Sequence, residues 1–281
     1  MDRIDMHVHT TASDGTLSPR DVTSLAAMLG LKAIAITDHD TMAGIPEAGE
    51  AGALLGVTIV PGIEISADYQ GREVHVLGYF LDPEAEKLKD YVNWARQQRQ
   101  ERNRKIAEKL RKKGYDVDID ALEAELPGVP IGRPHIARKL MELGAVDSVQ
   151  EAFRRYLDRG RSCYVPRTYI PMAQAISLIR DCGGAAVLAH PLQYGFTRAE
   201  LDKFVGAAAA AKCSGLEILY PGYTQTDQSR LYDLAEKYLL LPTGGSDFHG
   251  ENKPKIQLGS GDGSLSVPAY MLLMLAQSQY R

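Results

Sequence analysis

Short apolar runs alternate with amphipathic stretches in residues 1–82 and again in residues 165–281 of this chain. The runs have the length of buried strands, and the stretches between them repeat apolar residues at helical spacing. Ser18 followed by Pro19 is a typical helix start, because serine caps the first turn and proline is tolerated there. The pattern predicts strands at 3–9, 32–37, 57–60, 74–80, 185–189, 216–219 and 239–243, and helices at 19–29, 44–55, 171–181, 198–211 and 226–238. Repeated β-α units of this kind favour a parallel barrel or an open parallel sheet.

The alternation stops between residues 83 and 164, where apolar positions such as Leu88 and Tyr91 keep helical spacing throughout. We therefore expect a discontinuous α/β domain, residues 1–82 and 165–281, interrupted by an all-helical insertion that caps it. A chain of 281 residues with 44% hydrophobic residues can bury the core of such a domain.

Six of the seven histidines stand at or near the ends of the apolar runs, most of them beside acidic residues. They occur in Asp5-Met6-His7-Val8-His9, Thr37-Asp38-His39-Asp40, Val74-His75-Val76, Ala189-His190-Pro191 and Ser246-Asp247-Phe248-His249. Imidazole and carboxylate together suit divalent zinc, manganese or iron, whereas the three cysteines have no paired spacing that would favour a thiolate site. The sequence therefore predicts a metal centre and, as its reaction, metal-assisted hydrolysis.

The spacing within the motifs supports this interpretation, because alternate residues of a strand point to the same side. His7 and His9 are expected to project together, with Asp5 one pleat below as an acceptor that orients an imidazole. Asp247 and His249 share a side in the same way. A single histidine at a strand end is more often a satisfied core residue. The joint occurrence of these motifs is what favours a metal site.

The helical insertion is strongly basic. The segment from Trp94 to Lys113 contains nine Lys or Arg and two Glu, so its net charge is +7, whereas the net charge of the whole chain is −4. A solvated basic helix face explains most of these residues, but Arg99, Arg102 and Asn103 share one helix face and can bind an anion together.

A second anion site is predicted at Gly132-Arg133-Pro134-His135, which opens a helix in the insertion. Arg133 and His135 stand there beside free backbone N–H groups, a suitable seat for a phosphate. The alternative is a capping turn with a surface arginine. We prefer the phosphate seat because the motif lies in a basic insertion of a predicted metal protein.

Nothing at the start of the chain reads as a leader, since Met1 runs directly into the first strand, and no stretch approaches the ~18 apolar residues of a membrane span. Three cysteines at unrelated spacings read as free thiols in a reducing compartment. We expect a cytoplasmic protein with no membrane segment and no obligate protein partner.

Together these motifs resemble a known superfamily, the polymerase and histidinol phosphatase (PHP) proteins. The resemblance rests on His7-x-His9, Asp14, Asp38-His39, Glu64, His75, His190 and Asp247-x-His249, in this order. It implies a distorted (β/α)7 barrel, here with an all-helical insertion, and a centre of three divalent metal ions. Within the superfamily, the chain most resembles one subgroup, the nucleoside 3′,5′-bisphosphate phosphatases that also act as 5′→3′ exoribonucleases. The features shared with this subgroup are the helical insertion, Thr37-Asp38-His39-Asp40-Thr41 and Gly132-Arg133-Pro134-His135.

The resemblance also implies the roles of individual residues. It places His7, His9, Glu64 and Asp247 on one metal, Glu64, His75 and His190 on a second, and Asp14, His39 and His249 on a third. Manganese is the expected ion, with zinc or iron as alternatives. Catalysis is expected by a hydroxide that bridges two ions and attacks phosphorus, with Asp38, His39 and His190 in catalytic positions and Asp38 behind the ligands.

The expected substrates are nucleoside 3′,5′-bisphosphates and short 5′-phosphorylated oligonucleotides. The 3′-phosphate would lie on the metals, and the 5′-phosphate would contact Arg99, Arg102, Asn103, Arg133 and His135. The main alternative is a small-metabolite phosphomonoesterase of the histidinol-phosphatase type, which needs no second anion site. A deaminase-type amidohydrolase is a further alternative, but the basic insertion gives it no support. A non-catalytic metal-binding module is another, but the complete ligand set favours an enzyme.

Overall fold

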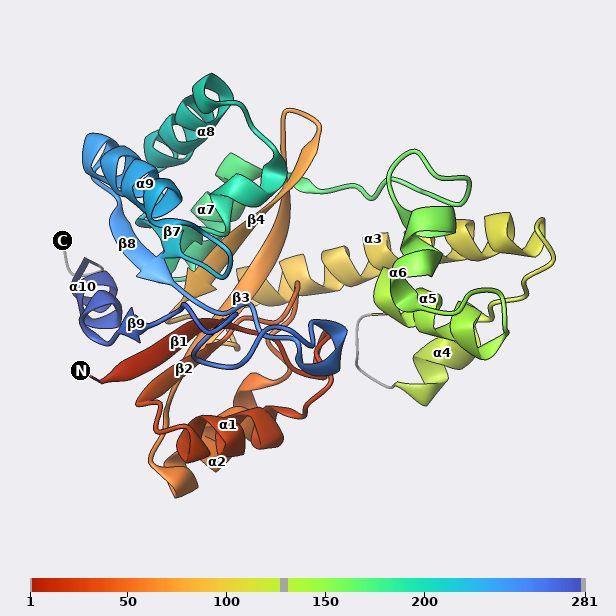
Figure 1. Ribbon diagram of the computed structural model, residues 1–281, viewed down its shortest axis with the longest axis horizontal. Coiled ribbons are helices and arrows are strands. Elements are labelled where there is room, and N and C mark those ends of the chain that lie inside the picture. Colours follow the sequence, from red (N-terminus) through yellow and green to blue (C-terminus); the bar gives the residue numbers. More distant parts are fainter. Residues whose placement is uncertain (1, 127–130, 279–281) are drawn as a thin grey trace. The chain divides into compact units, whose positions relative to one another are not determined.

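The computed structural model describes residues 2–126 and 131–278, which divide into two compact units (Figure 1). Unit 1 is built from the segments up to Asp90 and from Tyr169 onward, and unit 2 is Tyr91–Thr168. The sequence pattern places the two boundaries slightly earlier, after residues 82 and 164. Each unit has a hydrophobic core of its own.

Unit 1 contains a nine-stranded mixed sheet in the order β8-β7-β6-β4-β3-β2-β1-β9, with β5 paired to β3. Its strands are β1 (Arg3–Val8), β2 (Ala33–Ile36), β3 (Thr58–Tyr69), β4 (Arg72–Tyr79), β5 (Ile170–Pro171), β6 (Ala185–Leu188), β7 (Gly215–Leu219), β8 (Leu241–Gly244) and β9 (Val267–Pro268). Hydrogen bonds from Asp247 N to His7 O (2.8 Å) and from His9 N to Phe248 O (3.0 Å) join the segment after β8 to β1. The sheet is therefore a nearly closed barrel, and the predicted α/β barrel class is confirmed.

Strand β4 departs from the all-parallel order that repeated β-α units predict. It is antiparallel to both β3 and β6, and a turn at Gln70 and Gly71 connects it to β3. His75, in the first half of β4, consequently lies opposite Ser66 in the second half of β3. The sequence places the histidines at or near the ends of apolar runs, and His75 stands toward the amino end of its strand rather than the carboxyl end.

Strand β3 is also longer than the predicted strand at 57–60. It pairs with β2 as far as Pro61 and then with β4 from Gly62 onward, so that Glu64 lies inside the strand. At Gly62 the backbone passes close to its neighbours, since an added Cβ would lie 2.9 Å from Gly78 O and 3.0 Å from Ile36 O. A larger residue would push the strands apart at the point where β3 changes partner.

The helices predicted for unit 1 are confirmed, each to within one residue at either end. They are α1 (Pro19–Met28), α2 (Ile45–Leu55), α7 (Met172–Asp181), α8 (Arg198–Ala210) and α9 (Gln225–Tyr238), and α10 (Tyr270–Ser278) follows β9. Thr197 and Thr224 cap α8 and α9 with capping boxes completed by Glu200 and Asp227. Among the described residues, no helix is both long and apolar enough to span a membrane.

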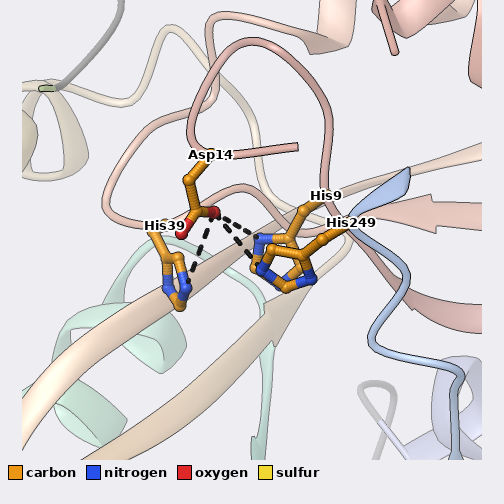
Figure 2. Close-up of side chains that lie close together, drawn as sticks. All are labelled: His9, Asp14, His39 and His249. Atoms are coloured by element: carbon orange, nitrogen blue, oxygen red, sulfur yellow. Dashed lines mark ion pairs between the residues drawn. The ribbon is translucent and has the colours of Figure 1, made fainter. Parts of the chain in front are cut away.

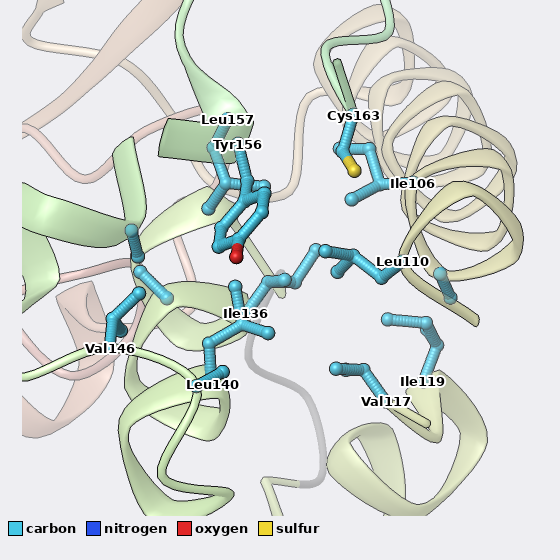
Figure 3. Close-up of a cluster of buried hydrophobic side chains, with 14 of the residues drawn as sticks. Ile106, Leu110, Val117, Ile119, Ile136, Leu140, Val146, Tyr156, Leu157 and Cys163 are labelled. Carbon is cyan, nitrogen blue, oxygen red and sulfur yellow. The ribbon is translucent and has the colours of Figure 1, made fainter. Parts of the chain in front are cut away.

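Unit 2 is helical throughout its described residues. It contains most of α3 (Glu86–Arg111), then α4 (Ile119–Glu125), α5 (Arg133–Glu142), α6 (Val149–Ala152) and a π-helical turn, η1 (Phe153–Leu157). Figure 3 shows its core, in which Ile106 and Leu110 of α3 lie near Ile136 and Leu140 of α5. These side chains are fully buried, so the unit has an apolar centre independent of the barrel.

Candidate metal centre

Nine imidazole and carboxylate side chains come together in unit 1, and they are the nine that the sequence predicts as metal ligands. Their donor atoms form four overlapping groups, within each of which all atoms lie within 4.8 Å of one another. The groups are His9 with Asp14, His39 and His249; His7 with Glu64 and His190; His7 with His9 and Asp247; and His39 with Glu64 and His75. Because neighbouring groups share members, the four make one continuous cluster.

Strands far apart in the sequence supply the cluster. His7 lies on β1, Glu64 on β3 and His75 on β4, while the other six follow the ends of strands: His9 and Asp14 after β1, His39 after β2, His190 after β6, and Asp247 and His249 after β8. The barrel brings these positions to one edge of the sheet.

Asp14 faces three imidazoles, as Figure 2 shows. Its Oδ1 atom lies 3.3 Å from His249 Nε2 and 3.9 Å from both His9 Nδ1 and His39 Nε2. The rings of His9 and His249 stack with centroids 4.0 Å apart. One carboxylate and three imidazoles form a donor set that suits a divalent transition metal.

Glu64 occupies the centre of the cluster and is fully buried. Its Oε1 atom lies 2.9 Å from His75 Nδ1 and 3.1 Å from His190 Nε2. Its Oε2 atom lies 2.8 Å from His39 Nδ1 and 3.3 Å from His9 Nε2. Because the two oxygens face different imidazoles, this carboxylate connects two of the ligand groups.

The state of the buried nitrogen atoms tests whether metal ions fit here. Both ring nitrogens of His9, Nε2 of His7, and Nδ1 of His39 and His75 are buried without a hydrogen bond, which is rare for polar atoms. Two ligand atoms on a tetrahedral ion, at ~2.0–2.2 Å from it, lie roughly 3.3–3.6 Å apart. The distances from His7 Nε2 and His9 Nε2 to the nearest oxygens of Glu64 and Asp247 are 3.3–3.6 Å. The cluster therefore fits divalent ions.

The carboxylates and imidazoles also set one another's protonation. Burial acts to raise the pKa of Glu64, but the imidazoles of His75 and His39 hold it well below its usual range. Burial acts to lower the pKa of His75, but the Glu64 carboxylate outweighs it and raises the pKa to about 10. Burial lowers the pKa of His9 well below its usual value, and the neighbouring His249 and His39 act in the same direction. Since metals bind neutral imidazoles, an ion must displace a proton from His75.

Glu217 on β7 is a functional residue that the sequence reading missed. It is fully buried, its Oε1 atom lies 3.0 Å from His7 Nδ1, and its Oε2 atom accepts a 2.7 Å hydrogen bond from His190 N. His190 has a φ of +26°, a backbone conformation uncommon for residues other than glycine. One carboxylate thus orients two members of the cluster. The available signal was a single acidic residue inside the apolar run Leu216-Glu217-Ile218-Leu219.

Asp5 does not orient an imidazole, so this expectation is wrong. Its carboxylate accepts hydrogen bonds from the backbone N–H groups of His7 (3.2 Å), Ser246 (2.8 Å) and Gly259 (2.8 Å). Three backbone donors bind the buried carboxylate and tie β1 to the segments after β8. Glu217 performs the role that we expected of Asp5.

Asp38 lies outside the four ligand groups. Its two oxygens accept hydrogen bonds from Thr10 N (2.8 Å), Thr10 Oγ1 (2.7 Å) and Ser13 Oγ (2.5 Å). These bonds order the loop that carries Asp14, which agrees with the expected place of Asp38 behind the ligands. Its catalytic role stays a prediction, as do those of His39 and His190.

The five predicted phosphate-binding residues belong to unit 2. Arg102 donates from Nε and Nη2 to Asn103 Oδ1, and Asn103 Nδ2 donates to Ile131 O at 2.7 Å. Asn103 is fully buried, and both ends of its amide are occupied in this way. It therefore fixes the position of Arg102 and of the segment before α5.

The remaining three surround the start of α5. His135 Nδ1 accepts a 3.0 Å hydrogen bond from Gly132 N, and the Arg133 guanidinium lies over the Phe153 ring, 5.8 Å from its centroid. Arg99 lines a cavity of about 10 Å³, room for about one water molecule, together with Arg96, Gln100, Asn103, Glu123, Leu126 and Ile131. Arg99 and Arg133 thus lie at the Gly132 turn, and the phosphate-binding role of all five residues stays a prediction.

Comparison with known proteins identifies the family. The family model described as the PHP domain matches residues 5–158, more than half of the chain. The chain belongs to this family, and the resemblance drawn from its motifs is confirmed. A solved structure described as a metal-dependent phosphoesterase from Bifidobacterium adolescentis superposes with a TM-score of 0.86 at 31% sequence identity. That match covers 98% of this chain and 96% of the other, so the fold extends over both units.

Three curated relatives are similar over most of their length. The chain is 35% identical to a 5′-3′ exoribonuclease of Haemophilus influenzae, with 88% of this chain and 90% of the relative covered. It is 32% identical to a 3′,5′-nucleoside bisphosphate phosphatase of Chromobacterium violaceum, with 89% and 88% covered. It is 34% identical to a phosphoribosyl 1,2-cyclic phosphate 1,2-diphosphodiesterase of Eggerthella lenta, with 88% and 94% covered. All three names describe hydrolysis of phosphoester bonds, and none favours the histidinol-phosphatase alternative.

Proposed function

We propose that this protein is a metal-dependent phosphoesterase that removes the 3′-phosphate of nucleoside 3′,5′-bisphosphates. We also propose that it degrades short 5′-phosphorylated oligonucleotides from the 5′ end. The observation that carries both proposals is the convergence of all nine predicted ligands in a chain related to an exoribonuclease and to a bisphosphate phosphatase.

The cluster would hold three divalent ions, manganese first, with zinc or iron as alternatives. We assign His7, His9, Glu64 and Asp247 to one ion, Glu64, His75 and His190 to a second, and Asp14, His39 and His249 to the third. The 2.9 Å and 3.1 Å distances from Glu64 Oε1 to His75 and His190, and the 3.3 Å distance from Asp14 to His249, support this division. When bound, such ions acidify water and neutralise phosphoryl oxygens.

The side chains of the cluster prepare it for that chemistry. Each carboxylate oxygen of Glu64 contacts an imidazole, and these contacts hold the ligand groups close to each other. Glu217 and the backbone bonds of Asp5 fix His7, and the bonds of Asp38 fix the loop of Asp14. These contacts set ligand positions in advance, so little reorganisation accompanies the reaction.

The remote 5′-phosphate would be recognised by unit 2. Arg99, Arg102 and Arg133 can supply charge-assisted, bidentate hydrogen bonds, and His135 stands beside them at the start of α5. Asn103 supports this site by holding Arg102, with its Oδ1 2.9 Å from Arg102 Nη2. The net charge of +7 between Trp94 and Lys113 favours an anionic substrate of this kind.

A second candidate function is hydrolysis of a phosphoribosyl cyclic phosphate, because the Eggerthella lenta relative is as similar to this chain as the others. Such a substrate uses the same phosphoester chemistry at the cluster. Because its phosphoribosyl group carries a further phosphate, it differs from a nucleoside 3′,5′-bisphosphate in the cyclic diester at the reacting end and in the absence of a base.

A substrate panel tests the proposal. Manganese-loaded protein is incubated with adenosine 3′,5′-bisphosphate, 3′-AMP, 5′-AMP, a short 5′-phosphorylated RNA, phosphoribosyl 1,2-cyclic phosphate and histidinol phosphate, and products are separated chromatographically. We expect the bisphosphate to yield 5′-AMP fastest and the RNA to release nucleotides from its 5′ end. Faster hydrolysis of the cyclic phosphate or of histidinol phosphate would replace this proposal by the corresponding alternative.

Loss of the central ligand provides the control for the panel. Glu64→Gln keeps the shape of the side chain but removes the charge that faces the imidazoles. We expect it to lose bound manganese and hydrolysis of every substrate while the protein stays folded by circular dichroism. Full activity in the metal-loaded variant would remove the assignment of the site.

A further inference from the structure

The two carboxylate oxygens of Asp247 have different surroundings. Oδ1 faces the imidazoles, at 3.4 Å from His9 Nε2, 3.4 Å from His249 Nδ1 and 3.6 Å from His7 Nε2. Oδ2 instead accepts a 2.7 Å hydrogen bond from Tyr220 Oη and lies 2.6 Å from Lys253 Nζ. Neither Tyr220 nor Lys253 belongs to the ligand groups or to the motifs found in the sequence.

The fold brings these two residues to Asp247 from different directions. Tyr220 directly follows β7, and Lys253 follows the 3₁₀ turn η3 (Gly250–Asn252). That turn is anchored to the loop of Asp14. Thr16 Oγ1 accepts a 2.9 Å hydrogen bond from Glu251 N, and Asn252 Nδ2 donates to Asp14 O. The two residues before Lys253 are thus tied to the loop that carries Asp14.

We propose that Tyr220 and Lys253 are positioning residues that hold Oδ2 of Asp247 and leave Oδ1 as the one atom offered to metal. We call this pair the Asp247 clamp. The inference rests on the metal centre of the proposed function, but it does not depend on which phosphoester is hydrolysed.

The clamp has a consequence for coordination. A carboxylate with both oxygens available can bind one ion through both and fill an additional position on it. With Oδ2 held by an ammonium and a phenol, Asp247 can contribute a single oxygen. A position on the ion is then left for water or a phosphoryl oxygen, which a catalytic metal site requires.

Metal binding without substrate tests the clamp. Lys253→Met and Tyr220→Phe each remove one contact to Oδ2 while keeping most of the side chain, and Lys253→Arg restores a cation. Lys255→Met is the matched control, because Lys255 is an exposed lysine two residues along the chain. Cobalt(II) is the probe: a chelator competition gives its affinity, and its visible absorption falls as the coordination number rises from four or five to six.

We expect Lys253→Met and Tyr220→Phe each to bind cobalt(II) about 10- to 100-fold more weakly than the wild type, as loss of a residue behind a ligand does elsewhere. We also expect their cobalt absorption to weaken, and Lys253→Arg to recover most of the affinity. A purely structural role would change the thermal stability of the metal-free protein and leave the cobalt spectrum unchanged.

Two results would overturn the proposal. One is a wild-type cobalt affinity and spectrum in both Lys253→Met and Tyr220→Phe. The other is an equal loss of affinity in Lys255→Met. Because no substrate is present, failure of the proposed function appears separately, as normal cobalt binding without hydrolysis of the bisphosphate.

Discussion

Glu217 Oε1 lies 3.0 Å from Nδ1 of His7, and both side chains are completely buried. The contact leaves Nε2 of His7 directed at Glu64 and Asp247, whose nearest oxygens are 3.3 and 3.6 Å away. A carboxylate behind a histidine fixes the ring and its tautomer, and it makes the other nitrogen a better metal ligand. The same carboxylate also holds the backbone of His190.

We therefore expect Glu217→Gln to weaken metal binding or activity by about 10- to 100-fold. The amide keeps the size of the side chain but loses the charge that favours ligation by His7. Metal content after dialysis and phosphate release from adenosine 3′,5′-bisphosphate measure the effect. Glu236→Gln, an exposed glutamate on α9, is the control, and an equal loss there would point to a general effect on the protein.

Seven of the nine ligands could be predicted because they stand in local motifs such as Asp5-Met6-His7-Val8-His9, whereas Asp14 and Glu64 are implied only by the resemblance to the family. Glu217 could not be found in this way, because its partner His7 is 210 positions away and no local pattern connects them. Asp5 was the natural choice, since it shares a strand side with His7. In the structure the oxygens of Asp5 instead accept hydrogen bonds from the backbone N–H groups of Ser246 and Gly259.

The direction of β4 could not be predicted from the sequence for a similar reason. Apolar alternation in a strand is the same whether its neighbours are parallel or antiparallel. Pro61-Gly62 predicts the end of a strand. In the structure the strand continues, and at these two residues β3 stops pairing with β2 and begins to pair with β4. The helices were predicted well because caps such as Ser18, whose side chain accepts from Asp21 N, are local signals.

Gly245 offers a steric test of the cluster. It is buried directly against His7, and a Cβ added there would collide with the Cβ and backbone nitrogen of that residue. We expect Gly245→Ala to lower the free energy of unfolding by about 1–3 kcal/mol, the usual cost of overpacking, and to reduce metal binding because His7 must move. Urea denaturation and metal content measure the two effects.

Gly49→Ala is the matched control for this substitution. Gly49 lies within α2, and an added Cβ meets no atom within 4 Å. Replacing a helical glycine by alanine at an open position stabilises a protein by about 0.4–1 kcal/mol. Unchanged stability and metal content in Gly245→Ala would contradict the close packing of Gly245 on His7.

The metal-free protein should lose stability as the pH rises. The pKa of His75 is about 10 in the folded state against 6.5 for an ordinary histidine, because Glu64 outweighs the effect of burial. A raised pKa stabilises the folded state fully below 6.5, and this contribution is lost as the pH rises toward about 10. We expect the Tm of chelator-treated protein to fall over this range.

Metal binding should show the opposite pH dependence. Imidazole must be neutral to bind an ion, so the affinity for manganese should rise over the same range as His75 loses its proton. His75→Gln should flatten the decline in Tm of the metal-free protein, since the glutamine does not titrate. A decline of the same steepness in this variant would assign it to other groups.

The remote phosphate provides the test that separates a bisphosphate phosphatase from a simple phosphomonoesterase. If Arg102 or Arg133 contacts the 5′-phosphate, its replacement by alanine removes a charge-assisted hydrogen bond of about 1.5–3 kcal/mol. That loss corresponds to a fall of roughly tenfold to a hundredfold in kcat/KM.

The comparison of two substrates isolates this contact. We expect Arg102→Ala and Arg133→Ala to lose activity on adenosine 3′,5′-bisphosphate but to match the wild type on 3′-AMP, because 3′-AMP has no 5′-phosphate to contact. Arg111→Ala is the control, since Arg111 ends α3 with a 65% exposed side chain and pairs with Asp116. Equal losses on both substrates would show that neither arginine recognises the 5′-phosphate, and the single-phosphate alternative would then be preferred.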